Sequence, residues 1–501
     1  MSARSDAAPR EDDAREDRED GHGKRRVLLI NAALRGITEI AGKAASIVLF
    51  AVIAHRLGEV AVGHYVTVLA LTQILWTVAD FGTNRWLLRE IAADRDAMRH
   101  LLADAVGLKV ATASALILAS TIVAAAVGAG ETMTALIALL GISMILDLAS
   151  TIPIAVFVAH EQMRYYTYAA IPNKYLQAAL GIAVILAGGG IVAVGAAAAA
   201  SSLVALVIAV WLLLRHYPRA ERNVSITRWP RMARSAGLFG VQDVLAQVVM
   251  RIDTVLLSLL VAGAAVGWYG ASYRLIDATL FISWSIVISA TPMYTYLSST
   301  SRPTIGEIYG DSVRLVLMLV VPVATTLFVC AHDIVNLAFG LEDFAPSVDI
   351  LRVLAFSPIF YALSNQAATL VLSRTSGIVV VRIFAIGAAL NIVLNVVLVS
   401  AFSYKAAAWV TLGTEALLAL LCQLAARRLT AGLPWPRLLA APALGGLAMA
   451  AVMLATGPTL WLAVPLGGLV YLGVIALIEV RLLGGSLRPV RAIEPLELVE
   501  P

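Results

Sequence analysis

The feature that most constrains this chain is a series of long apolar segments that follow one another from residue 28 to residue 480. Each has about 20 residues or more, the length that a helix needs to cross roughly 30 Å of hydrocarbon. Hydrophobic residues make up 60% of the 501 and charged residues only 14%, against roughly half and about a quarter in soluble domains. With so many segments, helices are the only plausible way to satisfy the backbone inside a bilayer. The sequence therefore predicts an all-α polytopic membrane protein.

Hydropathy indicates about fourteen transmembrane spans. Six are expected near 28–55, 61–82, 102–127, 132–159, 166–188 and 190–214. Six more are expected near 237–262, 267–298, 312–331, 346–372, 377–400 and 404–426, and two near 438–457 and 459–480. Every second loop is rich in arginine or lysine, from Lys24–Arg26 before the first span to Arg481–Arg491 after the last. Basic loops stay in the cytoplasm, so both termini are expected there, with the protein in the cell (inner or plasma) membrane.

The spans and loops divide the chain into six segments. Residues 1–26 alternate acidic and basic side chains and are expected to form a disordered cytoplasmic tail. The others are expected to be an N-terminal six-helix lobe (27–216), a cytoplasmic linker (217–236), a C-terminal six-helix lobe (237–430), two additional helices (431–482) and a cytoplasmic tail (483–501). The net charge of +4 follows from the basic loops, and no interleaving of aromatic and basic residues indicates nucleic acid.

The two six-span sets are related by an internal repeat. The turn Leu57–Tyr65 is similar to the turn Ala262–Tyr269, with glycines that allow a reversal and a tyrosine that anchors it. A shift of 208 positions also places Arg35, Glu39 and Lys43 on Asp243, Gln247 and Arg251. Both triplets are spaced by four and share one helical face. Such repeats are typical of transporters that bind substrate between two halves.

Charged residues within the spans are the candidate site. A charge at mid-bilayer costs several kcal/mol, so these side chains are expected to face protein or water. The candidates for the substrate cavity are Arg35, Glu39, Lys43, Arg251, Arg274, Asp277 and Asp243. One interpretation is that they pair internally, as Arg35–Glu39 and Arg274–Asp277, and only hold the bundle together. The other is a ladder of cations across the membrane for an anionic head group, because arginine binds phosphate bidentately.

Other polar residues carry weaker signals. Asp80 and Asp253 are candidates for proton or sodium coupling, and Lys109 is expected to reach the cytoplasmic interface by snorkelling. The sequence has no metal-ligand cluster, no nucleophile motif and no phosphate-binding glycine loop. We therefore expect no metal, no other cofactor and no catalytic residue, and a protein that is not an enzyme.

Several short motifs resemble those of the polysaccharide biosynthesis (Wzx-type oligosaccharide) flippases. Their superfamily also contains the multidrug antiporters and the lipid II flippases. The resemblance covers nearly all of residues 27–430 and depends on the order and spacing of the motifs. They are Arg56–Gly58 with Gly63 and Tyr65, Asp80–Gly82, Arg89–Ala92, Glu161–Arg164, Arg251–Leu257 and Val266–Arg274.

The resemblance implies two six-helix lobes around a central cationic cavity. It implies a flippase that moves undecaprenyl-diphosphate-linked oligosaccharide from the cytoplasmic to the outer leaflet by alternating access. The expected partners are this substrate, membrane lipid, and the polymerase and glycosyltransferases of surface polysaccharide synthesis. A multidrug/cation antiporter of the same superfamily is the alternative, since acids and bases in the stripes are roughly balanced. A membrane glycosyltransferase or polymer ligase is more remote, because the longest external loop, near 333–349, offers only Glu342 and Asp343.

Overall fold

The structure, a computed structural model, describes residues 11–94, 98–217, 224–261, 263–296, 302–430, 432–457 and 460–482. The side chains of 11–41, 99–100, 292–293, 295–296, 302–304 and 480–482 are not described. Within the described ranges the chain is helical and contains no strand, which confirms the predicted all-α class. The first-lobe helices are α1 (Glu11–Asp80), α2 (Thr83–Ala93), α3 (Met98–Ala126), α4 (Glu131–Ala159), α5 (Met163–Leu186) and α6 (Ile191–His216).

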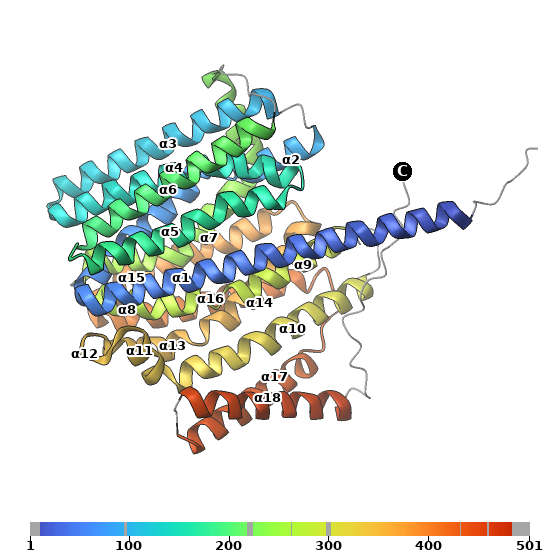
Figure 1. Cartoon of the computed structure of the whole chain (residues 1–501). Coiled ribbons are helices and arrows are strands. Elements are labelled where there is room, and N and C mark those ends of the chain that lie inside the picture. Colours follow the sequence, from blue (N-terminus) through green and yellow to red (C-terminus); the bar gives the residue numbers. More distant parts are fainter. Residues whose placement is uncertain are drawn as a thin grey trace, which may run out of the picture.

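The second half of the chain is divided into more helices. They are α7 (Trp229–Leu260), α8 (Gly263–Asp277), α9 (Phe281–Tyr296), α10 (Arg302–Val329), α11 (Ala331–Phe339), α12 (Leu341–Phe344), α13 (Pro346–Leu354), α14 (Ser357–Arg374), α15 (Ile378–Phe402), α16 (Tyr404–Ala426), α17 (Trp435–Ala455) and α18 (Leu460–Leu482). The helices run side by side, with α2 at one end of the bundle and α11–α13 at the other (Figure 1). We refer to these as the α2 end and the α11 end.

Twelve helical segments of the described chain are long and apolar enough to cross a membrane. The first, Gly42–Asp80, contains Gly58 with φ 76° and ψ 179°, a backbone conformation open to glycine that turns the chain back on itself. It therefore holds two spans, which we call the first and second arms of α1. The 32-residue α7 is not among the twelve, and it carries charged residues along its length. With α1 counted as two spans and α7 included, the bundle agrees with the expected number of about fourteen.

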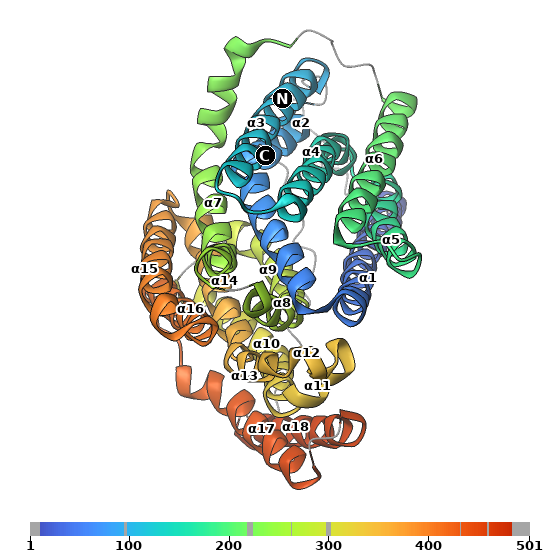
Figure 2. The same ribbon diagram turned by 90° about the vertical axis from the view of Figure 1, so that its left-hand side faces the viewer.

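The helices form two groups that meet along α1. The helices α3–α6 surround α1 on one side, and α8–α16 gather on the other (Figure 2). The second arm of α1 and the helices α7 and α8 contact one another where the groups meet. The pair α17–α18 packs outside, against α10. There the Tyr471 hydroxyl donates to the Met318 carbonyl at 2.8 Å, and Arg314 pairs with the buried Glu479.

Three segments differ from the sequence-based expectation. The span expected near 267–298 is broken between α8 and α9, and the loop expected near 333–349 is largely helical. The backbone is also helical from Glu11, within the segment expected to be disordered. Acidic and basic residues spaced by four, such as Glu11 and Arg15, favour helix over coil, and composition alone does not register this spacing.

The outward faces of the bundle are apolar. Leu118 on α3, Leu203 on α6 and Leu469 on α18 are half or more exposed, and in each of the twelve segments only 17% to 56% of the most apolar stretch is buried within the protein. A soluble protein does not expose such a continuous apolar surface. The surface fits the hydrocarbon of a bilayer, and the chain is a multi-pass membrane protein.

Candidate substrate cavity between the lobes

The two turns related by the internal repeat contact each other at the α11 end. A β-carbon at Gly63 would lie 2.2 Å from the Gly263 carbonyl oxygen, and one at Gly267 would lie 2.1 Å from the Glu59 carbonyl oxygen. Any side chain at Gly63 or Gly267 would therefore push the two lobes apart. The glycines that the sequence marked as turn residues have a second role, which is close approach between lobes.

A second contact between glycines closes the α2 end. A β-carbon at Gly82 would lie 2.8 Å from the Gly240 amide nitrogen, and one at Gly240 would lie 2.5 Å from the Phe81 carbonyl oxygen. Beside this contact, Arg85 of α2 pairs with Asp243 of α7 at 2.9 Å. The Arg85 side chain is 51% exposed, so this ion pair is accessible from the α2 end. The lobes thus touch at both ends of their interface.

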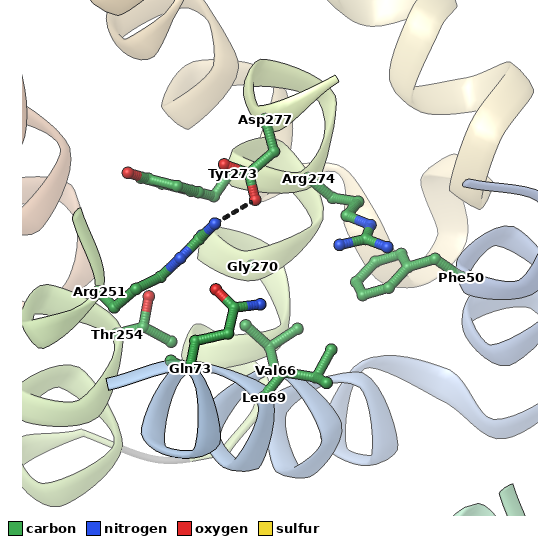
Figure 3. A pocket seen from close by; sticks show the side chains of 11 residues that line it. Phe50, Val66, Leu69, Gln73, Arg251, Thr254, Gly270, Tyr273, Arg274 and Asp277 are labelled. Carbon is green, nitrogen blue, oxygen red and sulfur yellow. Dashed lines mark hydrogen bonds and ion pairs between the residues drawn. The ribbon is translucent and has the colours of Figure 1, made fainter. Parts of the chain in front are cut away.

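A small cavity lies between these two contacts (Figure 3). Its volume is about 30 Å³, enough for water but not for a sugar. The cavity is lined by both arms of α1, α7 and α8. The lining residues are Phe50, Val66, Leu69, Ala70, Gln73, Arg251, Thr254, Gly270, Tyr273, Arg274 and Asp277. In this conformation the two lobes lie close together around Arg251 and Arg274.

Arg251 is held by a carboxylate and an aromatic ring. Its guanidinium donates to the Asp277 carboxylate at 2.8 Å and lies 5.2 Å from the Tyr273 ring centroid. Both charged side chains are mostly buried, at 16% and 12% exposed. On the other side of the interface, the Lys43 ammonium donates to the Asp277 backbone carbonyl at 3.3 Å. Asp277 therefore joins cationic side chains from both lobes.

Arg274 contacts the first arm of α1 across the lobe interface. It donates to the Ser46 hydroxyl in the first arm of α1, and its guanidinium lies 5.8 Å from the Phe50 ring centroid. The carboxylate of Asp277 forms its direct ion pair with Arg251 of α7 rather than with Arg274 of α8. Figure 3 shows the two guanidinium groups directed into the interface from separate helices.

The other residues expected in the cavity do not line it in the part of the chain that the structure describes. Asp243 lies at the α2 end, where it pairs with Arg85, and does not line the cavity. The side chains of Arg35 and Glu39 lie outside those that the structure describes. The sequence-based reasoning missed Gln73, whose amide oxygen accepts from Gln247 at 3.4 Å across the interface. A polar residue in the middle of the second apolar segment was the available signal.

Asp253 is fully buried beside the cavity, within the second lobe. Its carboxylate accepts hydrogen bonds from the Thr254 amide at 2.6 Å, from the Thr411 hydroxyl at 2.9 Å and from the Tyr269 hydroxyl. The bonds come from α7, α8 and α16. This group of oxygen atoms joins three helices of one lobe and is shielded from the cavity.

Asp80 is paired, and the expectation for Lys109 is wrong. The Lys109 ammonium lies 2.6 Å from the Asp80 carboxylate and donates to the Thr151 hydroxyl at 3.0 Å. The Lys109 side chain is 0% exposed, so it does not snorkel to an interface. A partner carboxylate one helix away removes the need to reach water, and hydropathy does not reveal such a partner.

The fold is that of a known class of membrane transporter. The chain is similar to the lipid II flippase MurJ in its inward closed conformation, with 14% identity over 89% of this chain and 99% of that one and a TM-score of 0.72. It is also similar to an inward-facing multidrug resistance MATE transporter of the MOP superfamily, with 14% identity, coverage of 80% and 98%, and a TM-score of 0.63. A MOP superfamily transporter from Pyrococcus furiosus matches at 13% identity, with coverage of 80% and 95% and a TM-score of 0.53.

The sequence identifies the family. The family model for polysaccharide biosynthesis proteins matches residues 28–297, which is more than half of the chain. The chain belongs to the polysaccharide biosynthesis protein family. Comparison with curated proteins gives no match. The resemblance stated from the motifs is thereby confirmed.

Proposed function

We propose that this protein is a flippase that moves an oligosaccharide linked to undecaprenyl diphosphate from the cytoplasmic to the outer leaflet. The observation that supports the proposal is the convergence of Arg251, Arg274 and Lys43 on the lobe interface around Asp277. A diphosphate is the part of such a lipid that is most costly to bring into the membrane. Two arginines on separate helices supply planar, bidentate donors for its oxygens.

Asp277 is the counter-ion of Arg251. Its carboxylate neutralises Arg251 inside a low-dielectric interface, where an unpaired charge would be costly. An incoming phosphate binds the Arg251 guanidinium and displaces the Asp277 carboxylate. With the carboxylate displaced, Arg251 and Arg274 together favour a dianionic group over the cationic drugs that a multidrug antiporter binds, which disfavours that alternative.

The glycine contacts at the two ends of the interface are the places where the lobes would separate in turn during alternating access. Opening the α2 end separates Gly82 from Gly240 and breaks the Arg85–Asp243 pair, while opening the α11 end separates Gly63 from Gly263. We place the α2 end and both termini in the cytoplasm, because the basic loops lie there. In this orientation the lipid-linked sugar enters at the α2 end, supplied by glycosyltransferases, and leaves at the α11 end toward a polymerase.

Ion coupling is assigned to Asp253 rather than Asp80. Asp80 has a lysine partner at 2.6 Å, whereas the hydrogen bonds to Asp253 come from hydroxyl and amide groups, and Asp253 lies two residues from Arg251 in sequence. Hydroxyl oxygens and a carboxylate can accept a proton or a sodium ion without rebuilding the site. Coupling to a gradient would bias which end of the interface opens.

A reconstituted flipping assay tests the proposal. Proteoliposomes receive a fluorescent undecaprenyl-diphosphate oligosaccharide, and its appearance in the opposite leaflet is measured. Arg251→Ala and Arg274→Ala should each abolish flipping while the protein still inserts and purifies as a monodisperse species. A matched control is Arg89→Ala on α2, whose side chain is 77% exposed and lies away from the cavity. Normal flipping by both cavity variants would remove the proposal.

A further inference from the structure

The outer face of the second lobe carries a groove that the transport cycle does not use. It runs between α15 and α16 and has a volume of about 490 Å³. The two helices pack against α7 and α14, and they lie on the side of the second lobe away from α3–α6 (Figure 2). The lining residues are Leu394, Leu398, Phe402, Lys405, Ala406, Trp409, Val410 and Gly413. All are apolar except Lys405.

The shape of the groove fits one hydrocarbon chain. Trp409 and Phe402 are 63% and 68% exposed and form its walls. A β-carbon at Gly413 would meet no atom within 4 Å, so the space above that residue is open. From Lys405 to Gly413 the helix rises about 12 Å, close to the depth of the hydrocarbon of one leaflet.

Cations mark the mouth of the groove at the α11 end. Lys405 and Arg352 both approach the Asp349 carboxylate, at 3.7 Å and 3.9 Å, and the three side chains are between 46% and 62% exposed. The trio has a net charge of +1. Exposed ion pairs of this kind contribute only about 0–1 kcal/mol, so Asp349 does not hold either cation firmly. Basic residues are scarce in the loops of this end, yet two of them converge here.

We propose that this groove is a binding site for a phospholipid with a singly charged phosphate, of the phosphatidylglycerol type. One acyl chain lies along α15 and α16, and the phosphodiester lies between Lys405 and Arg352. The net charge of +1 matches one phosphodiester. A polyprenyl diphosphate carries more charge and is better matched by the arginine cluster at the lobe interface. This lipid site goes beyond the proposed transport function, and it does not depend on what the cavity carries.

Quenching of Trp409 by brominated lipid tests the site in the full-length protein in nanodiscs. The Trp409 signal is the difference between the wild type and Trp409→Phe. Phosphatidylglycerol with a brominated chain should quench this signal at a lower mole fraction than brominated phosphatidylcholine does. Lys405→Gln and Arg352→Gln should each reduce that preference by about fivefold, since one cation near a lipid surface contributes about 1 kcal/mol.

Trp461 on α18 is the control, because its side chain is 83% exposed and it lies on a different helix from the groove. Its quenching should not distinguish the two lipids. Gly413→Leu keeps the charges but fills the groove, and it should reduce quenching of Trp409 by both lipids. Equal quenching of Trp409 by the two lipids, or no effect of Lys405→Gln, overturns the proposal. So does stronger displacement by undecaprenyl phosphate than by phosphatidylglycerol, which would identify a different occupant.

Discussion

Asp277 contacts two cationic side chains: its carboxylate pairs with Arg251, and its backbone carbonyl accepts a hydrogen bond from Lys43. Replacing a buried ion pair with well-packed apolar residues is often neutral or stabilising, so the Arg251–Asp277 pair is a poor device for stability alone. An arrangement that keeps Arg251 charged, oriented and ready to exchange its partner is a better account of its geometry. The second arginine, Arg274, donates to a hydroxyl and lies over an aromatic ring, and phosphate oxygens could replace the hydroxyl.

The first prediction concerns the geometry of Arg251. Arg251→Lys keeps the charge but loses the planar fork and the stacking on Tyr273, so we expect flipping to fall by at least about tenfold, equivalent to 1.4 kcal/mol. The rate is measured in the proteoliposome assay, with Arg89→Lys as the control for a general loss of arginine. A wild-type rate for Arg251→Lys would show that charge alone is sufficient at this position.

The second prediction concerns the buried pair in the first lobe. Lys109→Met leaves the Asp80 carboxylate buried without its cation, which should lower the free energy of unfolding by about 3–5 kcal/mol. Combining Lys109→Met with Asp80→Leu should restore most of it, because neither charge then remains. Thermal unfolding in detergent measures the stability of both variants.

The ion dependence of flipping should be unchanged in the Lys109→Met, Asp80→Leu double variant and altered in Asp253→Asn. The reverse result would move coupling to Asp80.

At the residue scale, the sequence predicts which helical faces are polar but not which charged residues pair. Spacing by four placed Lys43 and Arg251 at the interface, because helical periodicity fixes which face a residue occupies. It could not choose the partner of Asp277. Arg274 lies three residues away on the same helix, but Arg251 reaches it from another helix. Pairing between helices depends on their rotation and on rotamers, which single-chain spacing does not contain.

At the scale of elements, α11–α13 form a cap over the α11 end. The cap is tied to the second lobe, because the Trp268 indole donates to the Asp343 carbonyl at 2.7 Å and the Ser272 hydroxyl donates to the Ser347 carbonyl at 2.8 Å. Its contact with the first lobe is aromatic, with the Phe339 ring 5.6 Å from the Phe50 ring. The cap therefore belongs to one lobe and closes on the other.

The third prediction tests the cap as the closure of this end. Phe339→Ala removes a buried aromatic contact, so the α11 end should open more often. A cysteine placed by Ser46→Cys, next to Arg274 in the interface, should then react several-fold faster with a membrane-impermeant maleimide added outside cells. Phe402→Ala is the matched control, since that ring is at the same end but 68% exposed. Equal acceleration by both variants would mean that the cap does not control access.

The sequence predicts a loop near 333–349, where the structure has α11 and α12, and it assigns most of α13 to the span near 346–372. The helices α11 and α12 have nine and four residues, too short to be detected in a hydropathy window of about twenty residues. Helices this short are marginal on their own and form here through packing against α1 and α8. The long spans had no such dependence, because the bilayer itself requires them to be helical.

At the scale of the whole molecule, the interface has matching halves. The repeat brings Gly63 against Gly263 at one end, and Gly82 meets Gly240 at the other. The two-lobe arrangement was predictable, because the 208-residue shift in the charged stripes reveals the repeat. Which ends are closed was not, since closure depends on a free-energy difference between conformations that share one sequence.

The last prediction locks one end of this interface. Arg85→Cys and Asp243→Cys, made after Cys330→Ala and Cys422→Ala, place two thiols at the position of the 2.9 Å ion pair between α2 and α7. A short bifunctional thiol reagent should join them and stop flipping, because the lobes can no longer separate at the α2 end. A longer reagent should restore transport in proportion to its span, and each single-cysteine variant should be unaffected. Full flipping by the short-linked protein would contradict alternating access, since substrate would then cross without the α2 end opening.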